Sequence, residues 1–496
     1  MRLDELSLTV GDVTLGGFDA ESDRRLADYF VTTSYSVDVA SGRGTLFLGR
    51  KGSGKSALFD QLPRLLAADD PGLVLIRLTP DHYAWKALKG YVEEGLAQEQ
   101  AHTMAWKLTI ATEVAAAITA QDHHWSHEAS VSLGRLSKFV QDNFGELSTS
   151  PHTKAVSLLR SVSSLDVSAL GLLNIGIKLR AQSRSATPLI AEKLAELLAA
   201  PLREIGTMVC LDRLDESWDG SEEARSSLIG LLRAAKDLND HFGLHEGRGL
   251  RVITFLRSDI YDTLEFDDKD KHRPTERQIL WTVAELKEML RRRLPGGLTV
   301  DELFEPGRMG PAPGAFAYVA SRTFLRPREI LEFVDATIQA AAKIQAAGPR
   351  STIIERRSIR AAEGVYGNWK VEDLKQEYRR SCPIFGQVLE CLRNEPARFD
   401  SFDEVVSLFT RKAPDYVQYY TVYGLVQMLF EASAVGVRIK GSGAVRFKSQ
   451  DPFTVLPANA RIYVHPALHR GLDTLVSRRR DPSASISRPD TAAQAQ

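Results

Sequence analysis

The stretch Gly49-Arg50-Lys51-Gly52-Ser53-Gly54-Lys55-Ser56 decides the fold that the sequence predicts. It fits the pattern G-x-x-x-x-G-K-[ST], in which a glycine-rich loop between a strand and a helix surrounds phosphate oxygens with backbone N–H groups. The flanking residues suit this pattern, because the apolar run 45–48 precedes the loop and 57–62 predicts the start of a helix. We therefore expect a nucleotide-phosphate site here. The alternative is a glycine-rich turn that matches the pattern by chance.

The residues of this loop have distinct expected roles. Gly49, Gly52 and Gly54 allow positive φ and close approach of the backbone to phosphate. Lys55 is expected to reach the β- and γ-phosphates, and the Ser56 hydroxyl is expected to ligate Mg²⁺. The remaining predicted nucleotide-binding residues of this stretch are Ser53 and Ala57. The predicted cofactors are therefore ATP and Mg²⁺.

The size and composition of the chain are those of a globular protein with two or three domains. It has 496 residues, of which 43% are hydrophobic and 26% charged. The 63 basic and 64 acidic residues give a formal net charge of −1, which offers no support for non-specific nucleic-acid binding. The three cysteines (Cys210, Cys382 and Cys391) lack metal-ligand spacing and are expected to be reduced. No signal core or apolar stretch of about 18 residues is present, so we expect a cytoplasmic protein that does not enter a membrane.

Further apolar runs predict a parallel sheet. They are almost free of charge, as is typical of strands buried on both faces, and they comprise residues 73–78, 207–211, 250–256 and a short last run at 278–281. Helical patterns separate these runs, so the sequence predicts an α/β layered domain. Residues 120–190 break the regularity and are interpreted as a helical insertion. The adjacent histidines in it, His123 and His124, are expected in an exposed loop rather than a metal site.

Three acidic residues follow the third predicted strand. A buried strand that ends at Asp212 would deliver one carboxylate to Mg²⁺, directly or through water. Asp215 and Glu216 are both candidates for the base that orients an attacking water. The alternative is that these two acids cap the next helix.

Arginines at two other positions are candidate nucleotide contacts. Arg257 follows the fourth predicted strand and is expected near the γ-phosphate, the alternative being an ordinary surface arginine. Arg326 and Arg328 flank Pro327 at a predicted helix start that would face the nucleotide across a lid. Before the first strand, residues 23–30 predict a short amphipathic helix. It either lies over the adenine or packs on the sheet edge.

The C-terminal part of the chain predicts a different module. Two alternating runs, 435–440 and 444–448, flank a glycine-rich turn and indicate a β-hairpin after several helices, as in a winged helix. Residues 386–470 contain ten Lys or Arg and eight Asp or Glu, a net charge of +2, which is low for a DNA-binding surface. The hairpin itself is locally basic, so DNA binding stays an open alternative. The expected organisation is an ATPase core at 1–298, a helical lid at 299–374, a winged helix at 375–476 and a disordered tail at 477–496.

Taken together, these stretches resemble STAND-type P-loop ATPases of the AAA+-like branch, which carry a helical lid and a C-terminal winged helix. The resemblance rests on residues 49–56, 211–219, 255–259 and 464–468. The second stretch is similar to the NACHT pattern, which implies Mg²⁺ binding by Asp212 and water activation by Asp215 or Glu216. Arg257 matches the arginine after the fourth core strand. Arg213 stands where a small residue is usual, which leaves the choice between the two acids open. The resemblance also implies the strand order 5-1-4-3-2.

Two functions follow as hypotheses. The first is an ATP-binding and ATP-hydrolysing switch that acts with a protein partner or as a homo-oligomer, a type whose relatives serve in bacterial signalling and anti-phage defence. The second is an ATP-dependent protein that binds DNA through the winged helix. A basic surface on that module would favour the second, and an apolar surface would favour the first.

Overall fold

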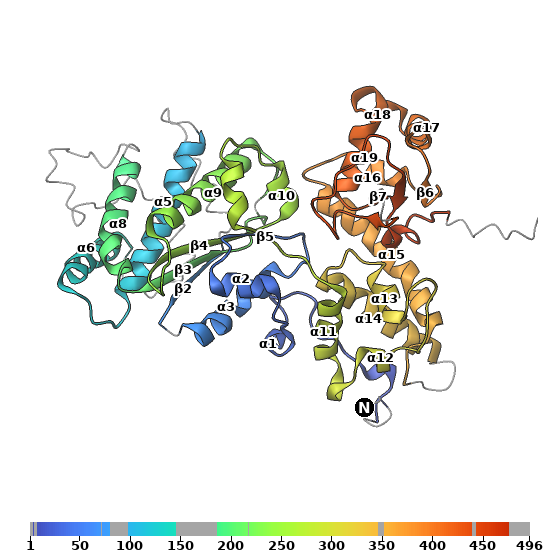
Figure 1. The fold of residues 1–496 in the computed structure, drawn as a ribbon, viewed down its shortest axis with the longest axis horizontal. Helices are drawn as coiled ribbons and strands as arrows, with labels where there is room; N and C mark the ends of the chain where they lie inside the picture. The colour runs from blue at the N-terminus through green and yellow to red at the C-terminus, as the bar shows by residue number, and fades with distance from the viewer. Residues whose placement is uncertain are drawn as a thin grey trace, which may run out of the picture. The chain divides into compact units, whose positions relative to one another are not determined.

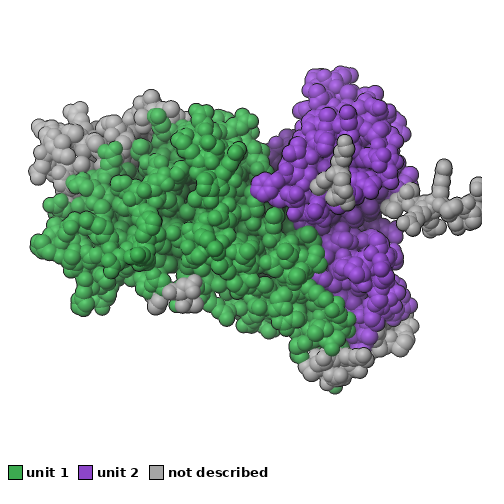
Figure 2. All heavy atoms as spheres, viewed as in Figure 1, with its two compact units in different colours: residues 1–8, 12–302, 325–332 green, residues 9–11, 303–324, 333–496 purple. Residues whose placement is uncertain are grey.

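The computed structural model describes residues 3, 7–70, 72–79, 98–144, 186–216, 218–345, 352–438 and 443–475. The chain forms two compact units, coloured separately in Figure 2. Unit 1 comprises residues 1–8, 12–302 and 325–332, and unit 2 comprises residues 9–11, 303–324 and 333–496. The end of the long segment of unit 1, at 302, lies near the expected boundary at 298. The expected boundary at 374 falls inside a helix of unit 2, α15 (Arg356–Tyr378). The expected tail at 477–496 lies outside the described residues.

Unit 1 contains a five-stranded parallel sheet (Figure 1). Its strands are β1 (Leu46–Leu48), β2 (Val74–Leu78), β3 (Gly206–Leu211), β4 (Gly249–Leu256) and β5 (Glu276–Gln278). All pairings are parallel, in the order β2-β3-β4-β1-β5. From the other edge this order is 5-1-4-3-2, as the resemblance implied. The predicted α/β class with a parallel sheet is confirmed.

The last strand lies two residues earlier than predicted. The apolar residues around Ile279 suggested a strand at 278–281, whereas β5 covers Glu276–Gln278. Because β5 is an edge strand, its polar side chains stay partly exposed, and apolar content is a poor guide to its position. Thr282 caps α11 (Val283–Arg293) as predicted, and its side chain and that of Glu285 form a reciprocal capping box.

Helices cover both faces of the sheet (Figure 1). On one face lie α2 (Ser34–Ser41) and α3 (Lys55–Asp69), and on the other lie α5 (Gln98–Thr119), α8 (Ala186–Leu202) and α9 (Glu222–Phe242). Neighbouring residues of β4 enter opposite cores, Val252 on the α5 side and Ile253 on the α3 side. This two-sided burial explains why the strands have nearly continuous apolar sequences.

The described part of the expected insertion belongs to the main core. Helix α6 (His127–Phe144) packs against α5 and α8, and its Leu136, Phe139 and Val140 join the cluster that covers the sheet. His123 and His124 are exposed, as expected. Residues 145–185, which include most of the expected insertion, lie outside the described residues.

We predict that this core loses stability as the pH falls below about 6.5. His102 on α5 is 1% exposed, both of its ring nitrogens are without a hydrogen-bond partner, and burial lowers its pKa, opposed only in part by Glu223. In this pH range His102 therefore binds a proton more readily in the unfolded chain than in the folded one. The free energy of unfolding falls by up to about 1.4 kcal/mol per pH unit as a result. In thermal melts, His102→Leu should reduce the loss of melting temperature between pH 7.5 and pH 5.5. The exposed His124→Gln is the control, and an unchanged pH dependence in His102→Leu would contradict the assignment.

Unit 2 combines helices with a small antiparallel sheet. Its helices include α13 (Ala315–Ala320), most of α14 (Pro327–Gln345), α15, α16 (Phe385–Glu390), α17 (Phe402–Lys412), α18 (Pro414–Tyr419) and α19 (Val422–Glu431). Its strands are β6 (Arg398–Phe399), β7 (Val435–Arg438), β8 (Val445–Arg446) and β9 (Ile462–Val464), in the order β6-β9-β7-β8. The predicted hairpin is confirmed, because β7 pairs antiparallel with β8.

Shorter elements complete the described chain. They are α1 (Leu26–Tyr29), α10 (Ser258–Thr263) and α12 (Val300–Leu303), with 3₁₀ turns at Val10–Asp12, Lys269–Thr275, Pro295–Gly297 and Pro466–Leu468. None of the helices in the described ranges has the length and apolar character needed to cross a bilayer.

Candidate functional site

The glycine-rich loop joins β1 to α3 in a conformation that depends on its glycines. Gly52 and Gly54 have φ of 78° and 95°, in the left-handed region that favours glycine. A Cβ on Gly49 would lie 2.3 Å from Ser53 Oγ, so a side chain does not fit there. Since α3 begins at Lys55, the N–H groups of its first turn are directed at the loop and favour an anion.

Lys55 is buried beneath the loop. Its side chain folds back, and Nζ donates to the carbonyl oxygens of Gly49 at 2.8 Å and Arg50 at 3.2 Å. Burial lowers the pKa of Lys55, and the nearby carboxylates of Asp215 and Asp212 oppose this shift. The cation therefore lies between the loop and the acids that follow β3.

Asp212 directly follows β3, with its carboxylate beside Ser56. It is 1% exposed, and burial raises its pKa despite the opposing charge of Lys55 and hydrogen bonds from Ser56 and the Arg213 backbone. Its Oδ2 atom is buried without a hydrogen-bond partner in the described structure. A hydroxyl and a carboxylate with one unpaired buried oxygen fit Mg²⁺, a hard cation that prefers oxygen ligands. The described ranges contain no group of three or more His, Cys, Asp or Glu suited to a metal. Mg²⁺ does not need such a group, because it usually keeps waters and substrate phosphates as ligands.

Arg257 links the end of β4 to the acids. It forms a two-point ion pair with Asp259, at 3.2 Å from Nε to Oδ1 and 2.6 Å from Nη2 to Oδ2. Its Nη1 also lies 3.6 Å from Asp215 Oδ2. Asp215, Arg257 and Asp259 all act electrostatically on Lys55. The fold thus brings residues from the ends of β1, β3 and β4 into one charged cluster.

Glu216 has a different environment from Asp215. Its carboxylate lies 3.9 Å from Arg213 Nε, and its side chain is 51% exposed. Arg213 adopts a φ of 61°, and its Nη2 lies 3.6 Å from Glu21 of the N-terminal segment. The two acids, which the sequence leaves equivalent, are therefore distinguished by their partners.

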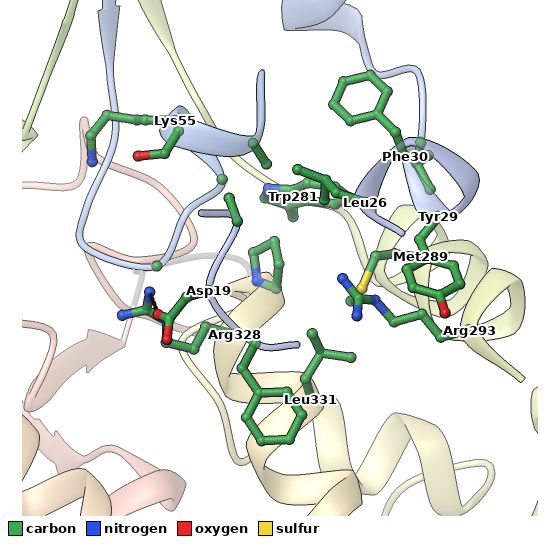
Figure 3. A pocket seen from close by; sticks show the side chains of 18 of the residues that line it. Asp19, Leu26, Tyr29, Phe30, Lys55, Trp281, Met289, Arg293, Arg328 and Leu331 are labelled. Carbon is green, nitrogen blue, oxygen red and sulfur yellow. Dashed lines mark hydrogen bonds and ion pairs between the residues drawn. The ribbon is translucent and has the colours of Figure 1, made fainter. Parts of the chain in front are cut away.

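The two arginines at the start of α14 belong to unit 1, and both lie against the loop. Arg326 is 6% exposed, donates from Nη1 to the Lys51 carbonyl at 3.1 Å, and has Nε 3.5 Å from Glu329. Arg328 forms an ion pair with Asp19, shown in Figure 3. Arg326 therefore donates to the loop backbone. Arg328 lies against Gly52, where an added Cβ would be 3.3 Å from Arg328 Cβ, and also lines the cavity beside the loop.

A cavity lies beside the loop within unit 1 (Figure 3). Its polar end includes Gly52, Gly54, Lys55, Ser56, Ala57 and Arg328, and its apolar wall includes Leu26, Tyr29, Phe30, Trp281, Met289 and Leu331. The predicted N-terminal helix, α1, thus contributes Leu26 and Tyr29 to the cavity wall.

Sequence reasoning missed two groups that shape this site. Trp281 donates from Nε1 to the Ser53 carbonyl at 2.8 Å. Arg293 forms a buried pair with Asp23 at 3.0 Å and donates to the Leu15 carbonyl at 2.7 Å, which holds the N-terminal segment against α11. No local pattern signals either contact, since the partners are far apart in the chain.

Comparisons with known proteins give two similarities. Residues 283–375 match a family described as the FunZ-associated C-terminal helical domain. The match begins with α11 and ends within α15, so it contains Arg326 and Arg328. The chain is also similar to the putative transposon gamma-delta 80.3 kDa protein of Escherichia coli (strain K12). The two are 23% identical over 511 residues, which cover 95% of this chain and 68% of that protein. This second likeness extends over both compact units.

Proposed function

We propose that this chain is an ATP-binding and ATP-hydrolysing molecular switch of the STAND/AAA+-like P-loop type. The observation that carries the proposal is the convergence of Lys55, Asp212, Asp215 and Arg257 beside a glycine-rich loop at a helix start. The carboxyl ends of parallel strands are where ligands bind in open α/β sheets. The sheet order matches the one that the family resemblance implies.

Different residues of the site have different roles in ATP binding and hydrolysis. Backbone N–H groups of the loop and α3 hold the phosphates, and Lys55 leaves its carbonyl partners to contact the β- and γ-phosphates. Ser56 and Asp212 would hold Mg²⁺, which neutralises phosphate charge when bound. Asp215 orients the attacking water and accepts its proton. Arg257 stabilises the charge on the transferring group.

The apolar wall of the cavity suits the base of the nucleotide. Tyr29, Phe30 and Trp281 offer aromatic surface, and Leu26 and Met289 add aliphatic contact. Ligand sites of this kind combine an apolar wall with a few polar groups at one end. The phosphates therefore occupy the loop end of the cavity, and adenine occupies the end formed by α1 and α11.

The switch requires contacts that depend on the γ-phosphate, because a ligand shifts an equilibrium only by its differential affinity for the two states. Arg257 is placed for such a contact by the Asp259 and Asp215 carboxylates. Arg326 directly precedes α14 and Arg328 lies in its first turn, and this helix continues from unit 1 into unit 2. A conformational change at the phosphate-binding loop could therefore be transmitted into unit 2 along this helix.

We expect ATP to protect the 295–313 segment from protease and ADP not to protect it. Arg257→Ala should remove this difference while ADP affinity stays nearly unchanged, because the lost contact involves only the γ-phosphate. Limited proteolysis in each nucleotide measures the effect. Arg291→Ala is the matched control, since this α11 arginine is exposed and pairs locally with Glu288. Identical digestion patterns in ATP and ADP would contradict the switch hypothesis and leave only the proposed ATPase activity.

The surface of the C-terminal module bears on whether the partner is a protein or DNA. Its described surface presents the exposed aromatic residues Tyr419, Tyr420, Tyr423 and Phe453. Tyr423 donates to the Leu456 carbonyl at 2.9 Å, which brings the start of α19 close to the loop that carries Phe453. An exposed aromatic surface is typical of protein interfaces. It favours a protein partner or a second copy of the chain, in a signalling or anti-phage setting.

DNA binding is the second candidate. The observations in its favour are the name of the E. coli relative, which assigns that protein to a transposon, and the basic residues Arg438 and Arg446 on the hairpin. ATP turnover measured with and without double-stranded DNA, at several salt concentrations, separates the candidates. Phosphate-mediated binding weakens steeply as salt rises.

A further inference from the structure

We propose that Trp281 is a positioning residue for the phosphate-binding loop. Its indole Nε1 donates to the Ser53 carbonyl oxygen at 2.8 Å, from a segment 228 residues further along the chain. This inference rests on the proposed function, because it assigns a role toward the phosphate groups of the nucleotide. It goes beyond that function by adding a neutral side chain that acts through the backbone.

The physical argument starts from the geometry of the peptide unit. A trans peptide is planar, so its C=O and N–H groups point in opposite directions. The hydrogen bond to the Ser53 carbonyl therefore also sets the direction of the Gly54 N–H, away from the indole. Gly54 has a φ of 95°, and a peptide beside a glycine has more conformational freedom than any other. Trp281 removes that freedom at the residue that immediately precedes α3 and Lys55.

The donor is itself held in place. The Trp281 ring packs edge-on against Tyr35, with ring centroids 5.9 Å apart, and lies against Gly54, where an added Cβ would be 3.6 Å from its Cζ2. The next residue, Thr282, is the N-cap of α11 and forms a capping box with Glu285. The indole N–H is thus presented by a fixed element. Fixed donors and dipoles are those that stabilise charge without reorganisation.

Other side chains hold neighbouring carbonyls of the same loop. Arg326 donates to the Lys51 carbonyl, and Lys55 donates to the Gly49 and Arg50 carbonyls. Both are cations that can also attract phosphate directly, so their substitution would mix two effects. Trp281 is neutral, and its N–H is engaged by the loop. With pyrophosphate, a ligand that has no base, its substitution therefore tests the backbone effect alone.

The test is Trp281→Phe, which keeps an aromatic ring on the cavity wall and removes the N–H donor. Calorimetric titrations with ATP, ADP, pyrophosphate and adenosine compare ligands with and without phosphate. We expect affinity for the three phosphate ligands to fall about five- to tenfold, the usual effect of one lost hydrogen bond. Adenosine affinity should fall less than pyrophosphate affinity, because the phenyl ring keeps part of the contact with the base and adenosine has no phosphate.

Trp106→Phe is the matched control. Trp106 Nε1 also donates to a backbone carbonyl, that of Ser227 at 3.1 Å, but in the helical layer on α5. This variant should lower the melting temperature and leave all four affinities unchanged. If Trp281→Phe binds ADP and pyrophosphate like the wild type, the positioning role is overturned and the proposed function stands. If Trp281→Phe lowers the affinity for adenosine and leaves that for pyrophosphate unchanged, Trp281 acts by packing on the base instead, and the positioning role is overturned. A wild type that binds none of the phosphate ligands removes both proposals.

Discussion

Asp215→Asn is expected to slow ATP hydrolysis by about 10²–10⁴-fold, the usual cost of losing a general base, while ATP still binds. Asp215 lies 3.6 Å from Arg257 and acts electrostatically on Lys55, so it is the acid that faces the proposed phosphate site. Asparagine has nearly the same shape but accepts no proton. Single-turnover hydrolysis of radiolabelled ATP measures the rate, and calorimetry measures the retained affinity.

Glu216→Gln is the matched control for this experiment. Glu216 is more exposed, and its described ion pair is with Arg213, so its amide variant should hydrolyse ATP within about threefold of the wild-type rate. If the Glu216→Gln variant hydrolyses ATP slowly and the Asp215→Asn variant hydrolyses it at the wild-type rate, Glu216 and not Asp215 is the base. Wild-type rates in both variants would mean that neither acid activates water.

Lys55→Ala is expected to reduce ATP affinity at least about tenfold, or about 1.4 kcal/mol. The change removes the buried cation closest to the loop and both of its bonds to loop carbonyls. ADP affinity should fall as well, since the β-phosphate loses the same contact. Calorimetric titration with each nucleotide measures the loss, and the melting temperature without nucleotide checks that the fold is retained.

Lys51→Ala separates this effect from a general loss of positive charge at the loop. Lys51 is in the same loop, but its side chain is exposed. Its removal should change ATP affinity by no more than about twofold, the scale of an exposed charge. Unchanged affinity in Lys55→Ala would reject the phosphate site as assigned here.

The N-terminal segment forms part of the cavity wall and is anchored by buried contacts. Arg293 is buried together with Asp23 and also lies over the Tyr29 ring at 4.6 Å. Breaking a buried pair leaves an uncompensated charge and is strongly destabilising. The buried pair therefore holds the segment against α11, and we propose that the base pocket is formed before a nucleotide binds.

The sequence alone determined the features that depend on short-range physics. Positive φ at Gly52 and Gly54 could be predicted, because only glycine adopts it without strain. The capping box of Thr282 and Glu285 depends on residues three apart, and the strands β3 and β4 are recognisable because both of their faces are buried. The α/β class, most of the strands and the hairpin of unit 2 follow from such local patterns. The strand order came from the family resemblance rather than from periodicity.

Only the tertiary structure decided how the candidate residues face one another. Asp215 and Glu216 are adjacent in sequence, yet one faces Arg257 and the other faces Arg213, because the chain turns between them. Trp281 and Arg326 reach the loop through contacts that span more than two hundred residues, and no local pattern encodes such contacts. The polar edge strand β5 was misplaced for a related reason. Its position is set by pairing with β1 and not by its own apolar content.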